Sequence, residues 1–148
     1  MAATVANGLL AGGSLIKSLV ELPARHRIGL PAMAAYNRAV DLGPGLALYP
    51  TLGLGASALT FAAAFAIYLG GDVRGVAAWW AYIAAVLSVA HIFTTVRAAP
   101  TLLRLRGGSN EQHVLGGVYA RFVGWQGARA IFQVVTFIVI VLALASAS

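Results

Sequence analysis

The sequence of 148 residues contains no cysteine and few charged residues. Without cysteine the chain has no disulfides, no thiolate metal sites and no CxxC redox motif, so the dithiol mechanism of small membrane quinone reductases is excluded. Charged residues make up 9% of the chain, whereas a soluble domain carries about 25%. Because so few charges cannot cover a water-facing surface, the composition indicates a membrane protein. Its length suits a single domain over residues 1–148.

Four apolar stretches are long enough to cross a hydrocarbon core about 30 Å thick, which requires about 20 helical residues. They predict membrane-spanning helices over residues 2–22, 46–69, 76–96 and 126–147. Pro23 is expected to end the first span, since proline cannot continue a helix interior. The last helix can begin as early as Gln112, outside the hydrocarbon. The predicted fold is therefore all-α, an integral membrane four-helix transmembrane bundle.

A short amphipathic stretch over residues 28–40 separates the first two spans. Pro31 suits a first helical position, and Gly-Pro-Gly at residues 43–45 breaks the chain before the next span. We expect an interfacial helix that lies on the membrane surface or packs against the mouth of the bundle. Gly-Gly-Asp at residues 70–72 predicts a tight turn, and Pro100 and residues 107–110 mark the loop before the last span.

Nine of the ten basic residues fall in two patches beside the spans. The first comprises Lys17, Arg25, Arg27 and Arg38, and the second comprises Arg97, Arg104, Arg106, Arg121 and Arg129. Basic loops stay in the cytoplasm. The pattern therefore predicts a multi-pass protein of the inner (plasma) membrane with both termini extracytoplasmic. Anionic lipid headgroups are the simplest partner for these arginines, and nucleic acid is not expected.

Within each predicted span the few polar residues share one helical face. The four stripes comprise Asn7, Ser14, Lys17 and Glu21; Tyr49, Gly53, Ser57 and Thr60; Ser88, His91 and Thr95; and Phe122, Gln126, Arg129, Gln133 and Thr136. Because an unpaired polar group in lipid costs several kcal/mol, the stripes are expected to face one another. Their depth predicts a polar pocket that opens toward the cytoplasm, above an apolar floor in the outer half.

Ionisable groups inside spans are functional candidates by default, but each has a structural alternative. His91, the one histidine in a predicted span, suits a catalytic base, a hydrogen bond to a neighbouring helix, or a single axial haem ligand. Lys17 and Glu21, four residues apart, can be a simple ion pair, and Lys17 can also extend to the headgroups. His26 and His113 fall in predicted loops at no metal-ligand spacing, so no metal site is expected.

Other polar and aromatic residues also have two interpretations. Arg129 and Gln133 suit hydrogen bonds between packed helices as well as ligand contacts. Trp125 can stack on a flat ligand or anchor its helix at the membrane interface. Trp79 and Tyr82 are typical of an aromatic belt at the outer interface.

Several short motifs distributed over most of the chain point to one family. They are residues 13–25 (GSLIKSLVELPAR), 35–38 (AYNR), 41–43 (DLG), 49–50 (YP), 97–100 (RAAP) and the pair Trp125-x-x-x-Arg129. Together they resemble the anthrone oxygenase-like family of small four-helix integral membrane proteins. Most members have no assigned activity. The others resemble oxygenases that convert polycyclic anthrones to anthraquinones without metal or flavin.

The resemblance implies an oxidoreductase that acts on a lipophilic aromatic molecule without a cofactor. For that chemistry we expect His91 to be the base, and Arg129, Tyr49 and Gln126 to be donors to the developing oxyanion. The remaining substrate contacts are expected from Lys17, Glu21, Thr95, Trp125 and Gln133. The alternative is a non-enzymatic lipid- or quinone-binding or accessory subunit. A small exporter is disfavoured, since four helices leave little room for alternating access unless the chain forms a homo-oligomer.

Overall fold

The computed structural model describes residues 1–71, 75–108 and 110–147, and every element assigned in these ranges is helical. The elements are α1 (Ala2–Ile16), a π turn (Lys17–Glu21), α2 (Leu22–Ile28), α3 (Leu30–Val40), α4 (Gly45–Leu69), α5 (Val76–Leu103), a 3-10 turn (Arg104–Gly107) and α6 (Gln112–Ala145). Four helical segments are long and apolar enough to cross a membrane, namely Ala2–Ile28, Gly45–Leu69, Val76–Gly107 and Gln112–Ala145. The predicted all-α four-helix bundle of a multi-pass membrane protein is confirmed.

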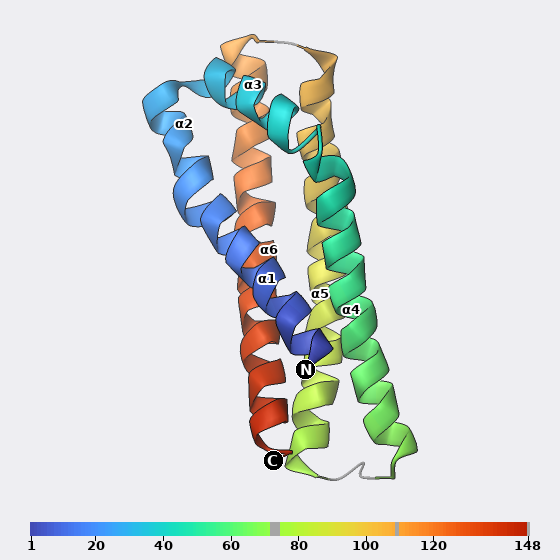
Figure 1. The fold of residues 1–148 in the computed structure, drawn as a ribbon. Coiled ribbons are helices and arrows are strands. Elements are labelled where there is room, and N and C mark those ends of the chain that lie inside the picture. The colour runs from blue at the N-terminus through green and yellow to red at the C-terminus, as the bar shows by residue number, and fades with distance from the viewer. Residues whose placement is uncertain (72–74, 109, 148) are drawn as a thin grey trace.

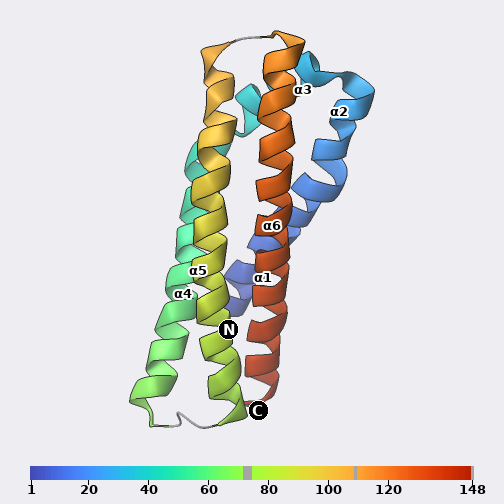
Figure 2. The same cartoon turned by 180° about the vertical axis from the view of Figure 1, so that it is seen from behind.

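The four long segments do not pack as parallel rods. α5 lies between α4 and α6 and contacts both, whereas α1 is inclined across α4 and α6 (Figures 1 and 2). The N-terminus lies partway along the bundle, and the C-terminus lies at the end away from α3 (Figure 1). Toward the α3 end, α1 and α2 lean away from α4 (Figure 1).

Pro23 does not end the first helix, contrary to the prediction. The helix continues to Ile28, through a π turn in which the N–H of Leu22 donates to the carbonyl of Lys17. Proline lacks an N–H and its ring crowds the preceding turn. The wider π turn directly before Pro23 is the kind of local adjustment that accommodates such a residue within a longer helix. The helix ends instead at Gly29, whose φ of 83° favours glycine.

Other helix limits also extend past the predicted spans. α5 continues through Pro100 to Leu103, so that proline lies inside the helix and not in the following loop. α6 begins at Gln112, as expected. His26 and His113 lie in α2 and α6, not in loops. In the turn after α4, Gly71 has a φ of 79°, whereas Asp72 is outside the described residues.

α3 confirms the predicted helix between the first two spans and packs across one end of the bundle (Figure 1). Met33, Ala34 and Asn37 of this helix are at most 1% exposed. Met33 and Ala34 belong to a hydrophobic cluster with residues of α2, α5, the 3-10 turn and α6, which include Leu22, Ala98, Leu105 and Phe122. This packing covers part of that end of the bundle.

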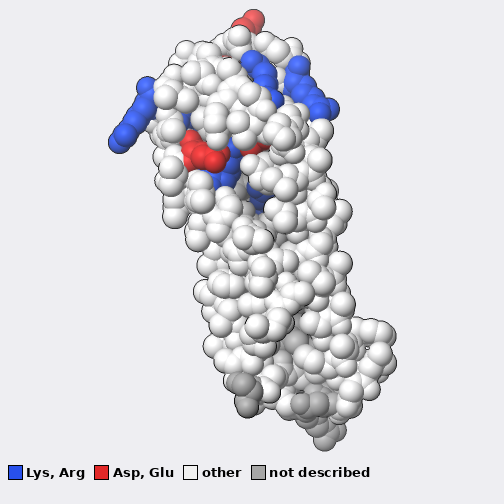
Figure 3. Space-filling model, in the orientation of Figure 1, with Lys and Arg blue, Asp and Glu red and all other residues white. Residues whose placement is uncertain are grey.

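The charges and the polar stripes are distributed largely as expected. Lys and Arg side chains gather at the end of the molecule that α3 covers (Figure 3). The stripes point inward, and Asn7, Ser57, Thr60, Ser88 and Thr136 are all buried. Asn7 Nδ2 donates to Thr60 Oγ1 at 3.0 Å, and Ser14 donates to Gln133 Oε1. These bonds join α1 to α4 and α6 and satisfy polar groups that lipid cannot satisfy.

Candidate functional site

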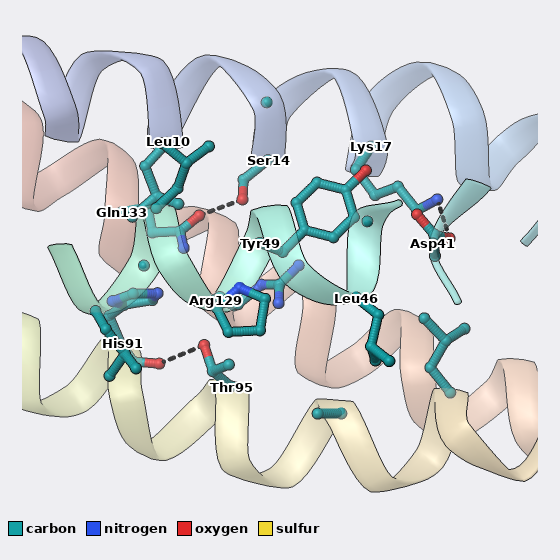
Figure 4. A pocket seen from close by; sticks show the side chains of 18 of the residues that line it. Leu10, Ser14, Lys17, Asp41, Leu46, Tyr49, His91, Thr95, Arg129 and Gln133 are labelled. Carbon is teal, nitrogen blue, oxygen red and sulfur yellow. Dashed lines mark hydrogen bonds and ion pairs between the residues drawn. The ribbon is translucent and has the colours of Figure 1, made fainter. Parts of the chain in front are cut away.

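A cavity of about 300 Å³ lies between α1, α4, α5 and α6, in the half of the bundle nearest α3 (Figure 4). Most of its lining residues are apolar. Its polar lining residues are Ser14, Lys17, Asp41, Tyr49, His91, Thr95, Arg129 and Gln133. Six of the nine predicted site residues are among them, so the structure brings most of the predicted site into one cavity.

The cavity opens on the side of the bundle. Figure 3 shows charged atoms of both signs at the bottom of a hollow on this face, below the end that α3 covers. At the rim, Leu9, Leu46 and Val96 line the cavity and remain 63%, 42% and 62% exposed. These residues belong to three of the helices that can span a membrane. The opening therefore faces the layer that lipid chains occupy.

One end of the cavity holds a buried ion pair network centred on Lys17, the only lysine of the chain. Lys17 is 6% exposed. Its Nζ lies 2.6 Å from Asp41 Oδ2 and 2.8 Å from Glu21 Oε2. The predicted pair with Glu21 is confirmed, and Asp41 provides a second carboxylate. Lys17 is thus held inside the bundle and does not extend to the headgroups.

Tyr36 of α3 packs against the same network. The Lys17 ammonium lies 5.4 Å from the centroid of the Tyr36 ring, within the range of a cation–π contact. Burial raises the pKa of the Tyr36 phenol above its usual value of 10.0, and the nearby Glu21 carboxylate raises it further. The hydroxyl is therefore protonated at neutral pH and donates toward the Glu21 carboxylate.

Asp41, at the C-terminal end of α3, is the main site residue that the sequence did not predict. It is 3% exposed, and its Oδ2 accepts hydrogen bonds from both Lys17 and Asn37. Asn37 Oδ1 in turn accepts a bond of 2.7 Å from the Tyr119 hydroxyl. The chain of bonds therefore runs from the first spanning helix through α3 to α6. A sequence pattern that could have pointed to Asp41 is its four-residue spacing from Asn37 in a stretch with few polar groups.

Arg129 reaches the cavity from α6 and has no carboxylate partner within 4.0 Å among the described residues. One of its terminal nitrogens donates to Gln126 Oε1. Its Nε is buried and has no acceptor in the part of the chain that the structure describes. Gln126 is fully buried and also donates to Ser18 Oγ at 3.3 Å. Gln126 therefore supports Arg129 from behind and does not line the cavity.

His91 faces the cavity from α5, opposite Gly53 of α4. A Cβ on Gly53 would lie 3.5 Å from Cε1 of the imidazole, so the glycine lets α4 pass close to the ring. Thr94 and Thr95 donate to the backbone carbonyl of His91 at 2.8 and 3.0 Å. Within the described ranges no residue forms a hydrogen bond with the ring nitrogens. The imidazole is thus available to a molecule in the cavity, and the alternative of a hydrogen bond to a neighbouring helix is not observed among these residues.

Trp125 and Glu21, two further predicted contacts, lie outside the lining. Trp125 packs edge-on against Phe93 of α5, with ring centroids 6.3 Å apart and an interplanar angle of 79°. It therefore contributes to helix packing and does not offer its face to the cavity. The side chain of Glu21 is 26% exposed and contacts Lys17. Within residues 1–71, 75–108 and 110–147, no three His, Cys, Asp or Glu residues are placed to hold a metal ion.

Comparison with protein-family models, with curated protein sequences and with solved structures found no match to this chain.

Proposed function

We propose that the protein binds a lipophilic aromatic molecule in this cavity and oxidises it with molecular oxygen, without a cofactor. The observation that carries the proposal is that His91, Tyr49 and Arg129, from three different helices, line one largely apolar cavity on the side of the bundle. A volume of about 300 Å³ is at the lower end of the range for small-molecule sites. The motif resemblance to the anthrone oxygenase-like proteins supports the same chemistry.

The proposed reaction starts at an acidic CH₂ group next to the aromatic rings of a ketone. A ring nitrogen of His91 removes one proton, and the negative charge spreads onto the carbonyl oxygen. Arg129 and Tyr49 stabilise that oxyanion as hydrogen-bond donors. The carbanion combines with O₂ to give a peroxide, which regains the proton from His91. Loss of water with the second hydrogen of that carbon leaves a new carbonyl, so CH₂ and O₂ become C=O and H₂O without an external reductant.

A direct test uses the purified protein in detergent and follows the absorbance of an anthrone under air and under argon. We expect an anthraquinone to appear in air faster than in matched micelles without protein, with one O₂ consumed per substrate. Conversion at the background rate would contradict oxidation of this substrate class.

The second candidate function is a non-enzymatic lipid- or quinone-binding or accessory subunit. It is favoured by the lateral opening, which suits any lipophilic molecule and does not require a reaction. In this case a quinone would raise the thermal unfolding midpoint of the protein, and an anthrone would be bound but not converted.

We also propose that the protein lies in the inner (plasma) membrane, with the α3 end in the cytoplasm and both termini on the other side. Support comes from the Lys and Arg side chains gathered at that end (Figure 3), since basic loops stay in the cytoplasm. Arg27, Arg106 and Arg121 are exposed there and suit anionic lipid headgroups.

A further inference from the structure

We infer that Asp41 determines the specificity of the cavity, and that its ligand is an uncharged molecule with two polar groups. One is a hydroxyl that donates to Asp41 Oδ1, and the other is a carbonyl that accepts from Arg129 Nε. The inference rests on the proposed ligand site but not on the oxidation.

Two buried atoms of cavity-lining residues lack a hydrogen-bond partner among the described residues. They are the Oδ1 acceptor of Asp41 and the Nε donor of Arg129. Buried polar groups are normally paired, and leaving one unpaired costs free energy. An unpaired acceptor and an unpaired donor in the wall of one cavity favour a ligand that brings the complementary donor and acceptor.

The Asp41 carboxylate is fixed in orientation. Its Oδ2 is occupied by Lys17 Nζ at 2.6 Å and by the Asn37 amide, and the side chain is 2% exposed. These two contacts leave Oδ1 without a partner among the described residues, and the Tyr49 hydroxyl lies close to the same carboxylate, so a ligand hydroxyl at Oδ1 would bind beside it. Arg129 is fixed similarly, since Gln126 accepts from one of its terminal nitrogens.

The charges around the cavity favour a neutral ligand. Lys17 and Arg129 are two cations, and Glu21 and Asp41 are two carboxylates, so the side chains of the site balance. A fatty-acid carboxylate placed against Asp41 would meet a like charge, and a lipophilic amine would meet Lys17 and Arg129. Burying either unpaired charge is costly. An uncharged molecule that carries one donor group and one acceptor group avoids both penalties.

The order of residues along the cavity fits such a molecule. In Figure 4, Asp41 and Lys17 lie at one end and His91 at the other, with Tyr49 and Arg129 between them. A ligand whose hydroxyl reaches Asp41 therefore presents its carbonyl to Arg129 and the next part of its ring system to His91.

Binding is tested with rings that cannot be oxidised at a CH₂ group, so that turnover does not affect the result. The probes are 2-hydroxyanthraquinone, anthraquinone, anthracene and anthraquinone-2-carboxylate, titrated into the detergent-solubilised protein at a pH that keeps the phenol protonated. We expect 2-hydroxyanthraquinone to bind about tenfold more tightly than anthraquinone, because it adds a hydrogen bond to a carboxylate. Anthracene and the carboxylate should bind least.

Variants test the contributions of Asp41 and Arg129 to the binding of these probes. Asp41→Asn should reduce the tenfold preference for the hydroxyl to about twofold, since the acceptor loses its charge. Glu111→Gln, at an exposed carboxylate away from the cavity, is the matched control and should keep the preference. If Asp41→Asn does not fold, Arg129→Gln provides the second test and should weaken both quinones about tenfold relative to anthracene.

Equal binding of 2-hydroxyanthraquinone and anthraquinone to the unaltered protein would overturn the role of Asp41 and leave the proposed ligand site intact. Tightest binding of the carboxylate would overturn the neutral ligand. Failure of all four probes to bind would instead count against the proposed function.

Discussion

The ammonium of Lys17 lies 2.6 Å from Oδ2 of Asp41, although 24 residues separate them along the chain. The pair joins the π turn of the first spanning helix to the C-terminal end of α3. Glu21 and Asn37 complete the network on either side. The contact that holds α3 across the end of the bundle is thus the same contact that forms the charged end of the cavity.

Replacing Lys17 is expected to destabilise the fold. Lys17→Met leaves the buried Asp41 and the partly buried Glu21 without their cation, and breaking a buried pair in this way costs about 3–5 kcal/mol. The thermal unfolding midpoint in detergent, followed by circular dichroism, should fall markedly. Arg27→Met, at an exposed arginine of α2, is the control and should change stability by about 0.5 kcal/mol at most. Equal midpoints for the two variants would show that the network does not stabilise the fold.

Substitution of His91 separates catalysis from binding. His91→Gln should lower the rate of anthrone oxidation about 10²–10⁴-fold, the usual contribution of a general base, while 2-hydroxyanthraquinone still binds. His26→Gln, at an exposed histidine of α2, should leave the rate unchanged. An unchanged rate in His91→Gln would exclude this residue as the base, and loss of the folded protein would assign it a structural role.

Two adjacent glycines of α1 offer a matched pair for blocking the cavity. Gly13 lines the cavity and Gly12 does not, and a Cβ at either position meets no atom within 4 Å. Gly13→Leu should therefore fold, place its side chain at the mouth, and weaken probe binding about tenfold or more, equivalent to about 1.4 kcal/mol. Gly12→Leu should bind the probe normally. Similar affinities for both variants would place the ligand elsewhere.

The absence of cysteine makes the orientation testable with single introduced thiols. Arg106→Cys lies at the α3 end, and Ala147→Cys lies at the opposite end; both positions are exposed. A membrane-impermeant maleimide applied to intact cells should label Ala147→Cys, and Arg106→Cys only after the membrane is permeabilised. The reverse pattern would contradict the proposed orientation.

The sequence predicts the four spans and their inward faces because both depend on local patterns. Apolar length sets the spans, and the spacing of residues such as Ser14, His91 and Gln133 places them on the buried sides of their helices. Helix limits were less predictable. Pro23 is expected to end a helix by the general rule, but the π turn before it lets the helix continue.

Local sequence patterns could not predict the site residues whose positions depend on tertiary packing. Asp41 enters the site because α3 folds back across the bundle, and no spacing in the sequence relates it to Lys17. The positions of Trp125 and Gln126 depend on the rotation of α6 about its axis. That rotation directs Trp125 toward Phe93 and places Gln126 behind Arg129. A shared helical face therefore predicted the group of residues but not which of them contact the cavity.

Because the cavity opens on the side of the bundle, its occupancy depends on the concentration of the ligand in the bilayer and not on its concentration in water. A molecule that enters between lipid chains is present at its mole fraction in the bilayer, which for a strongly partitioning compound far exceeds its aqueous level. Modest intrinsic affinity is then sufficient to fill the cavity in a cell. An apparent dissociation constant measured in micelles should rise in proportion to the detergent added, because each additional micelle dilutes the ligand in the phase from which it binds.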